Sequence, residues 1–276
     1  MAEFGEHPPI PDSIENLLSD DTVSTVFLKA ECPTRVKSGH ISSLTLNQLD
    51  DSPWDKPTLE NLCDELSMVI EQNSKRSDCF IEIERIGCKI MQIGDLRITC
   101  AWPPFSDAWE ITIVRPVAHL QISDYNLNPE LMDRLKDHHR GVFVVGRPGS
   151  GKTTFAQAIA SYLDSEVGAM VKTMEAPRDL QVPQRITQYA PLEGDLEKTA
   201  EVIFLVRPDF VIFDEVRRTR DFEIFGDVRL AGVGLLGVTH ANSALEAIQR
   251  MVGKVELGLI SQVLDTVIHI EKGKIA

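Results

Sequence analysis

The chain has 276 residues, enough for one large domain or two modest ones, and its 42 acidic and 28 basic residues give a formal net charge of −14. This acidic balance excludes the broad basic surface of a typical nucleic-acid-binding protein, so any contact with nucleic acid must come from a local set of basic side chains, a further domain or a partner. The acidic amino terminus is no signal peptide, and no apolar run approaches the ~18 residues of a membrane-spanning helix, so we expect a cytoplasmic protein without an integral membrane segment.

The first third of the chain begins with a segment of unusual composition. Residues 1–20 are rich in proline and in acidic residues, which predicts a linker or a flexible arm. The β-branched run over residues 22–29 then predicts a strand. Residues 57–73 predict a helix, because its leucines recur on one helical face and a proline opens its first turn.

Short apolar runs separated by tight turns follow the predicted helix. They are Cys79–Ile86, Cys88–Ile93, Leu96–Trp102 and Trp109–Arg115. Alternating runs of this length predict the strands of an antiparallel meander. With the preceding strand and helix they indicate a smaller α+β domain, an antiparallel sheet plus a helix, over residues 21–125.

After Asp124 the pattern changes to strands that alternate with helices, which is typical of a mostly parallel sheet in an α/β domain. The expected strands are Gly141–Val145, Ala169–Met174, Phe210–Phe213, Leu235–Thr239 and Thr266–Ile270. The expected helices span about 128–139, 152–163, 195–206, 220–231 and 243–253. We therefore place a second domain at residues 126–276.

The sequence GRPGSGKT follows the first of these strands and precedes a predicted helix. Glycines allow the backbone to fold around a polyphosphate with its N–H groups inward, and the helix amino terminus favours an anion. In such a phosphate-binding loop Lys152 meets the β- and γ-phosphates and the Thr153 hydroxyl ligates Mg²⁺. The residues expected to bind the nucleotide are Gly146, Arg147, Pro148, Gly149, Ser150, Gly151, Lys152, Thr153 and Thr154.

Two carboxylates end the apolar run Phe210–Phe213. A buried parallel strand that ends in carboxylates delivers them to the sheet edge where the phosphate-binding loop lies. Asp214 can hold Mg²⁺ through water, and Glu215 can orient or activate the attacking water. In isolation the pair could be a solvated acidic turn, but its position about 60 residues after the loop favours a functional role.

Two further polar residues follow predicted strands. Glu175 comes directly after the strand that ends at Met174, where a carboxylate could also polarise water. His240 follows the strand that ends at Thr239, where a histidine could sense the γ-phosphate by hydrogen bonding. For His240 taken alone, a histidine satisfied at the sheet edge is the simpler interpretation.

These segments together resemble the secretion and PilT-type ATPases, RecA-like ring motors that drive pili and secretion. Gly146–Thr153 is similar to their Walker A loop, and Met174–Pro177 to their acidic box. Leu205–Glu215 resembles their Walker B region, and Leu230–Asn242 their histidine box. The resemblance implies a RecA-like P-loop NTPase core that uses ATP and Mg²⁺.

The resemblance also implies roles for the site residues. By it, Glu175 polarises the attacking water, Glu215 manages Mg²⁺ and His240 contacts the nucleotide. The chain departs from the family pattern in three places: it has Asp214 where the family usually has glycine, Val233 where the first histidine of the box stands, and Arg217-Arg218 where the family often has Arg-Asp. Both Glu175 and Glu215 remain candidates for the water-orienting carboxylate.

A closer resemblance is to an archaeal subset in which the motor lies between an amino-terminal PIN nuclease-like domain and a carboxy-terminal KH domain. Stretches that carry it include Phe80–Ile83, Pro103–Asp107, Ala176–Gln181 and Phe213–Glu215. The chain carries neither flanking domain, so we expect either part of a longer protein or a pared-down motor core. Any nucleic-acid contact is then expected through the flanking domains.

The resemblance further implies a homo-hexameric ring, in which the amino-terminal domain of one subunit supplies arginines to the nucleotide of its neighbour. Arg97 and Arg115, on predicted strands of the meander, are the candidates. An arginine near the γ-phosphate would stabilise charge in the transition state. The alternative is that both form surface ion pairs of little energetic weight.

These features raise three candidate functions. The first is a Mg²⁺-dependent ATP-hydrolysing ring motor that acts on nucleic acid, in translocation or helicase-like remodelling. The second is an ATPase for assembly or retraction of a pilus or secretion system. The third, a nucleotide-gated scaffold that does not hydrolyse ATP, conflicts with the presence of Lys152, Thr153 and Glu215.

Overall fold

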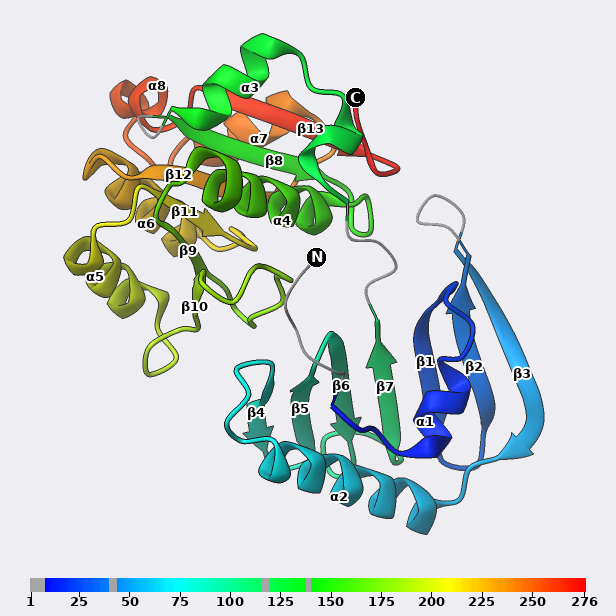
Figure 1. The fold of residues 1–276 in the computed structure, drawn as a ribbon. Coiled ribbons are helices and arrows are strands. Elements are labelled where there is room, and N and C mark those ends of the chain that lie inside the picture. The colour runs from blue at the N-terminus through cyan, green and yellow to red at the C-terminus, as the bar shows by residue number, and fades with distance from the viewer. Residues whose placement is uncertain (1–7, 40–43, 116–119, 138–139) are drawn as a thin grey trace. The chain divides into compact units, whose positions relative to one another are not determined.

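The computed structural model describes residues 8–39, 44–115, 120–137 and 140–276. These residues form two units, 1–118 and 119–276, each with its own apolar core (Figure 1). In the described ranges, no helix has both the length and the apolar character needed to cross a membrane.

The first unit is a seven-stranded antiparallel sheet in the order β3-β2-β1-β7-β6-β5-β4, with α1 and α2 packed against it (Figure 1). Its elements are α1 (Asp12–Leu17), β1 (Val23–Lys29), β2 (Pro33–Ser38), β3 (Thr45–Pro53), α2 (Lys56–Gln72), β4 (Cys79–Arg85), β5 (Cys88–Ile93), β6 (Leu96–Ala101) and β7 (Glu110–Val114). On β6, Leu96, Ile98 and Cys100 are buried and the residues between them are more exposed, which is the alternation expected of a strand with one face on the core. Helix α2 begins where the Asp55 side chain accepts a hydrogen bond from the Thr58 N–H at 2.7 Å.

The prediction of a linker or flexible arm is wrong for residues 8–20. Helix α1 lies there, and Ile14 and Leu18, four residues apart, are 0% and 7% exposed in the core of the first unit. Two apolar side chains on one face of a single helical turn are enough to anchor a short helix to a sheet. Residues 1–7 of the predicted arm lie outside the described residues.

Strands β2 and β3 were not predicted. Most side chains of β3 are polar and exposed, and β3 lies at the edge of the sheet, so it carries little of the apolar alternation that identifies a strand. Pairing with β2, which in turn pairs with β1, creates this strand. The four strands of the predicted meander and the helix α2 are confirmed.

The second unit is an α/β domain built on the sheet β10-β9-β11-β12-β8-β13-β14, in which every pair except β13 and β14 is parallel. Its strands are β8 (Gly141–Gly146), β9 (Val171–Met174), β10 (Thr187–Tyr189), β11 (Phe210–Phe213), β12 (Gly234–His240), β13 (Thr266–Glu271) and β14 (Lys274–Ile275). Its helices are η1 (Ile122–Tyr125), α3 (Pro129–Lys136), α4 (Lys152–Tyr162), η2 (Leu163–Val167), α5 (Leu196–Val206), α6 (Thr219–Leu230), α7 (Ala244–Met251), η3 (Leu257–Leu259) and α8 (Ile260–Val263).

Helices cover both faces of this sheet. On one face of the sheet, side chains of α4 and η1 form a core with side chains of β8 and β12 (Figure 1). On the opposite face, side chains of α5, α6, α7 and α8 form a second core with the alternate side chains of the same strands. Strand β8 is buried along its whole length for this reason. The predicted α/β class and its five strands are confirmed; the end of the predicted helix at 138–139 lies outside the described residues.

The boundary between the units falls about seven residues before the one predicted near residue 125. Helix η1 explains the difference, because Ile122 is buried and the Tyr125 ring lies edge-on to the Phe155 ring of α4, with centroids 4.7 Å apart. These side chains belong to the core of the second unit, so the segment that precedes α3 does too.

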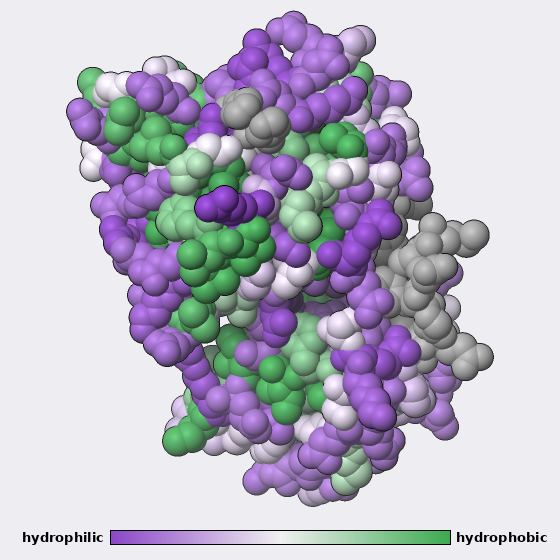
Figure 2. Space-filling model, turned by 60° about the vertical axis from the view of Figure 1, so that its left-hand side comes forward, coloured by the Kyte–Doolittle hydropathy of each residue, from purple (hydrophilic) through white to green (hydrophobic). Residues whose placement is uncertain are grey.

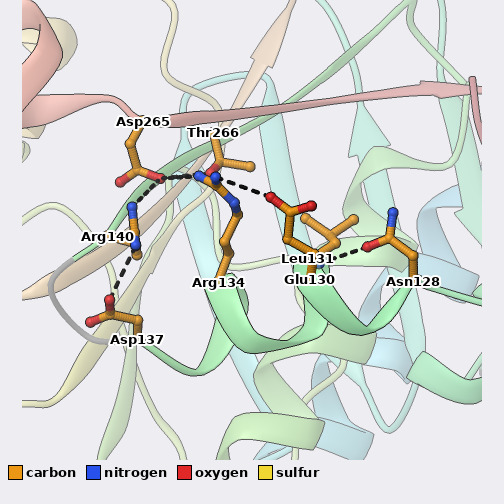
Figure 3. A network of polar contacts seen from close by, with 8 residues as sticks. All are labelled: Asn128, Glu130, Leu131, Arg134, Asp137, Arg140, Asp265 and Thr266. Atoms are coloured by element: carbon orange, nitrogen blue, oxygen red, sulfur yellow. Dashed lines mark hydrogen bonds and ion pairs between the residues drawn. The ribbon is translucent and has the colours of Figure 1, made fainter.

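A network of polar side chains joins segments at the amino-terminal edge of the second sheet (Figure 3). The predicted phosphate-binding loop follows the other end of β8. Asp265 accepts a hydrogen bond from the Gly141 N–H at 3.0 Å and lies 3.9 Å from Arg134 Nη1 and 3.7 Å from Arg140 Nη1. Arg140 also pairs with Asp137 at 3.1 Å. The network therefore joins the end of α3 to the starts of β8 and β13.

Polar side chains predominate on the surface that Figure 2 shows, and apolar ones gather in separate patches. Three consecutive apolar side chains at the end of α5 are exposed, Phe204, Leu205 and Val206, and Leu205 is 83% exposed. Small exposed apolar groups of this size are normal on protein surfaces.

Candidate nucleotide-binding site

The predicted phosphate-binding loop joins the end of β8 to the start of α4. Gly149 and Gly151 have φ angles of 72° and 96°, in the left-handed region that glycine adopts without strain. The Gly273 N–H, in the turn between β13 and β14, donates to the Ser150 carbonyl at 2.8 Å and so supports the loop from behind. The loop thus leads into the amino terminus of an eleven-residue helix, a geometry that suits an anion.

Lys152 opens helix α4 and is only 5% exposed. Its Nζ donates to the Arg147 carbonyl at 2.9 Å, across the loop. Burial lowers the pKa of Lys152, and the negative charges of Asp214 and Glu215 oppose this. The lysine therefore lies within electrostatic reach of the carboxylates of Asp214 and Glu215.

The Ser150 hydroxyl is buried in the same loop and has no hydrogen-bond partner among the described residues. A buried hydroxyl without a partner costs about 1–3 kcal/mol, which a ligand oxygen would recover. The loop therefore has a buried hydroxyl whose hydrogen-bonding capacity is unmet among the described residues.

Asp214 follows β11 at the carboxyl edge of the sheet and is 3% exposed. Its Oδ1 has no partner within the described part of the chain. Burial, followed by the charges of Glu175 and Glu215, raises the pKa of Asp214 to about 8. A carboxylate held under these conditions has a strong electrostatic demand for a cation.

Glu215 is half-buried and adopts a φ of 66°, a left-handed conformation that is strained for a residue other than glycine. Its carboxylate pairs with the Arg217 guanidinium. Burial raises the pKa of Glu215, and the Arg217 charge opposes the increase. Strain of this kind at the end of a central strand accompanies functional sites.

Glu175 follows β9 and its side chain is fully buried, with 0% exposure. Its carboxylate accepts hydrogen bonds from the Thr173 hydroxyl, the Gln188 amide and the backbone N–H groups of Asp179 and Leu180. Burial raises the pKa of Glu175, and these hydrogen bonds oppose the increase. Glu175 is near enough to Asp214 for its charge to act on that carboxyl.

His240 is the last residue of β12 and pairs in register with Gly146 at the start of the phosphate-binding loop. Its Nδ1 is buried without a partner in the described ranges. Burial, followed by the positive charges of Lys152 and Arg217, lowers the pKa of His240. The imidazole is therefore held neutral at neutral pH, beside the loop.

Arg97 and Arg115 lie in the first unit. Arg97 is on β6, opposite Val114 of β7, and the Arg115 guanidinium donates to the carbonyls of Leu18, Asp20 and Val23. These bonds join Arg115 to the segment after α1, a local role that the sequence did not indicate. The role of either arginine at a nucleotide stays a prediction.

Sequence reasoning missed three residues of this region. Asp179 acts by its charge on both Asp214 and Glu215, and Thr173 and Gln188 hold Glu175. Asp179 follows Glu175 by four residues, so a carboxylate in that segment was a usable signal. Gln188 showed no such signal in the sequence, because the strand on which it lies, β10, was not predicted.

The residues present fit a nucleotide with Mg²⁺. Among the described residues, no group of three or more histidine, cysteine, aspartate or glutamate side chains could hold a metal ion by itself. Mg²⁺ commonly binds through one or two protein ligands together with phosphate oxygens and water. The partnerless Oδ1 of Asp214 and the Thr153 hydroxyl, next to Lys152 in the first turn of α4, supply that small number.

Comparison with known proteins shows what the chain is similar to. The family model described as type II/IV secretion system protein matches residues 111–271. The chain is 51% identical over 256 residues to an uncharacterized KH and PIN-domain containing protein of Methanocaldococcus jannaschii, covering 93% of this chain and 39% of that protein. It is 37% identical over 257 residues to the Holliday junction branch migration ATPase PINA of Sulfolobus acidocaldarius, covering 93% of this chain and 50% of that protein.

Solved structures show the same fold at low sequence identity. The pilus retraction motor PilT with bound ADP superposes with a TM-score of 0.69 at 16% identity, covering 95% of this chain and 78% of PilT. The ATPase DotB of Legionella pneumophila gives a TM-score of 0.68 at 15% identity, covering 98% of this chain and 79% of DotB. The predicted architecture is confirmed: a smaller antiparallel α+β domain comes first in the chain, and an α/β domain of the PilT kind follows it in sequence.

Proposed function

Since the chain belongs to the type II/IV secretion system protein family, we propose that it is a P-loop ATPase, a Mg²⁺-dependent ring motor that hydrolyses ATP to ADP and phosphate. The observation that carries the proposal is the buried Lys152 at the start of α4, within reach of the charges of Asp214 and Glu215. A loop of this geometry with a lysine and two carboxylates suits a nucleoside triphosphate and its metal ion.

In this proposal the residues from Gly146 to Thr154 bind the phosphates. Backbone N–H groups of the loop surround the β-phosphate, and Lys152 leaves the Arg147 carbonyl to meet the β- and γ-phosphates. Thr153 and Asp214 hold Mg²⁺. When bound, the metal ion neutralises charge that develops on the phosphate oxygens.

Three side chains around the γ-phosphate complete the chemistry. Glu175 or Glu215 orients the attacking water, and neutral His240 donates a hydrogen bond to a phosphate oxygen from beside Gly146. In a homo-hexameric ring, Arg97 or Arg115 of a neighbouring subunit would add positive charge in the transition state. ATP as the nucleotide rests on family membership.

We propose nucleic acid as the material on which the motor acts, in branch migration, translocation or helicase-like remodelling. Two relatives support this: one is named a Holliday junction branch migration ATPase, and the other carries KH and PIN domains. The chain spans only 39% and 50% of their lengths, so domains outside it would make much of the contact. The alternative, an ATPase of pilus or secretion assembly or retraction, is favoured by the description of the family model.

Two proposals are tested by measuring phosphate release from Mg²⁺-ATP. Release by the chain alone tests ATP hydrolysis, and its stimulation by four-way DNA junctions, duplex DNA or RNA tests the action on nucleic acid. Lys152→Ala should abolish tight ATP binding and hydrolysis while the circular dichroism spectrum stays that of the wild type. Normal turnover in that variant refutes the site. Hydrolysis that no nucleic acid stimulates, even when PIN and KH domains are joined to the chain, would favour the pilus or secretion ATPase, which binding to an inner-membrane platform protein would then support.

A further inference from the structure

The carboxylate of Glu175 has no free acceptor position. A carboxylate offers about four lone-pair directions. Oε1 accepts from the Thr173 hydroxyl and from Gln188 Nε2 at 2.9 Å, while Oε2 accepts from the N–H groups of Asp179 and Leu180, the latter at 2.7 Å. All four directions are filled by protein donors, and the side chain is fully buried.

A general base must accept a hydrogen bond from the water that it activates. For Glu175 to do so, one of its four donors would have to leave, inside a region that solvent does not reach. Breaking one such bond to an ionised group costs about 1.5–3 kcal/mol, before any penalty for the donor left behind. Glu175 is therefore poorly placed to be the base.

The same four bonds give Glu175 a different task, which is to close the segment between β9 and β10. Asp179 and Leu180 lie in the middle of that segment, and Gln188 lies on β10. Gln188 Nε2 also donates to the Leu180 carbonyl at 2.8 Å, and the Glu175 N–H donates to the Tyr189 carbonyl at 3.0 Å. The segment is thus folded around one carboxylate.

The folded segment brings a further charge to the site. Asp179, whose N–H is held by Glu175, is near enough to Asp214 and Glu215 for its charge to raise the pKa of both. A displacement of the segment would change the electrostatic surroundings of the metal ligand and of Glu215 together.

Glu215, unlike Glu175, has an acceptor position that no protein donor fills among the described residues. It is half-buried, its Oε1 pairs with Arg217, and its Oε2 has no hydrogen-bond partner in the part of the chain that the structure describes. It lies one residue after Asp214 at the carboxyl edge of β11, within reach of the Lys152 charge. An acceptor position is therefore open beside the phosphate-binding loop.

We infer that Glu175 is a positioning residue, which folds the segment 176–188 around its carboxylate and so holds Asp179 within electrostatic reach of Asp214, and that Glu215 is the carboxylate that orients the attacking water. The inference rests on the proposed ATPase activity and assigns its two candidate carboxylates. It reverses the assignment that resemblance to the family implies.

Replacement by glutamine separates the two roles. In Glu175→Gln the amide oxygen can still accept from the N–H groups of Asp179 and Leu180, and the amide nitrogen can donate to the Thr173 hydroxyl. The amide nitrogen can no longer accept from Gln188 Nε2, so one of the four bonds is lost, and the side chain cannot take a proton. A positioning residue tolerates this change and a base does not. We expect Glu175→Gln to keep kcat within about tenfold of wild type and Glu215→Gln to lower it by about 100-fold or more.

Hydrogen exchange measured by NMR supplies the second readout, at the amides of Asp179 and Leu180. Glu175→Ala should speed exchange at both amides by about tenfold or more and lower kcat, while Glu215→Gln should leave both protected. A loss of about 100-fold in Glu175→Gln with both amides still protected overturns the inference.

If Glu175→Gln loses both turnover and amide protection, a variant that keeps the Glu175 carboxylate distinguishes the positioning role from the role of base. Thr173→Val with Gln188→Met removes two donors from Glu175 and leaves it free to act as a base. Loss of turnover in this double variant supports the positioning role, and wild-type turnover overturns it. Absence of hydrolysis in the wild-type chain would instead defeat the proposed function, while the exchange data still report whether Glu175 holds the segment.

Discussion

The substitution Asp214→Asn should stabilise the second unit in the absence of magnesium, and by more as the pH rises. Asp214 is 3% exposed with a partnerless Oδ1, and its pKa rises from 3.8 to about 8 through burial and neighbouring negative charge. Between these two pKa values the folded state holds a proton that the unfolded state has lost. The free energy of unfolding therefore falls as the pH increases through that window.

The expected slope follows from proton linkage. One proton bound only by the folded state lowers the free energy of unfolding by about 1.4 kcal/mol per pH unit. Over the window from 3.8 to about 8 the Asp214 contribution amounts to roughly 6 kcal/mol as an order of magnitude, and it is absent below that window and constant above it. Asparagine has no such titration, so the difference between variant and wild type should widen from pH 5 to pH 8.

Urea unfolding at several pH values, with EDTA and without nucleotide, measures this difference. All three tryptophans, Trp54, Trp102 and Trp109, lie in the first unit, so tryptophan fluorescence reports that unit and circular dichroism reports the transition of the second in addition. The test is how the difference in the free energy of unfolding between variant and wild type changes with pH. Its absolute size is less informative, because the amide of asparagine makes contacts of its own that change this free energy equally at every pH. A difference that does not grow between pH 5 and pH 8, or that shrinks, refutes the environment described for Asp214. If Asp214 is the Mg²⁺ ligand that we propose, the same variant should also fail to hydrolyse ATP.

Two further predictions concern the first unit. Ile14→Ala should lower its free energy of unfolding by about 2–5 kcal/mol, because the side chain is fully buried; an unchanged tryptophan-fluorescence midpoint in urea would restore the flexible-arm interpretation. Arg115→Ala should lower the same free energy by about 2 kcal/mol, since it removes charge-assisted bonds to three carbonyls. If either arginine reaches a neighbouring nucleotide, Arg97→Ala or Arg115→Ala should also lower turnover at saturating ATP more than ATP affinity, under conditions where the first unit stays folded; wild-type turnover in both variants excludes the ring role.

Local patterns in the sequence predicted the parts of the fold whose residues themselves signal their environment. The strands β4 to β7 and helix α2 follow from apolar spacing, because one of their faces is buried and the other is not. The edge strand β3 could not be found in this way, because most of its side chains are polar and exposed. Helix α1 was not predicted, because its six residues lie among prolines and acidic residues and are too few to show helical apolar periodicity. Ile14 and Leu18 nevertheless lie in the core.

The sequence by itself determined the glycine-rich loop between β8 and α4, Lys152 and the Asp214–Glu215 pair as a candidate site, because each is a run of neighbouring residues on one strand, loop or helix. Tertiary structure alone decided how the carboxylates differ. Pairing of β9 with β10 and β11 brings donors from Thr173, Asp179, Leu180 and Gln188 around Glu175, and leaves acceptor positions open on Asp214 and Glu215. Hydrogen-bond saturation and burial depend on which distant segments pack together, and local spacing does not contain that information.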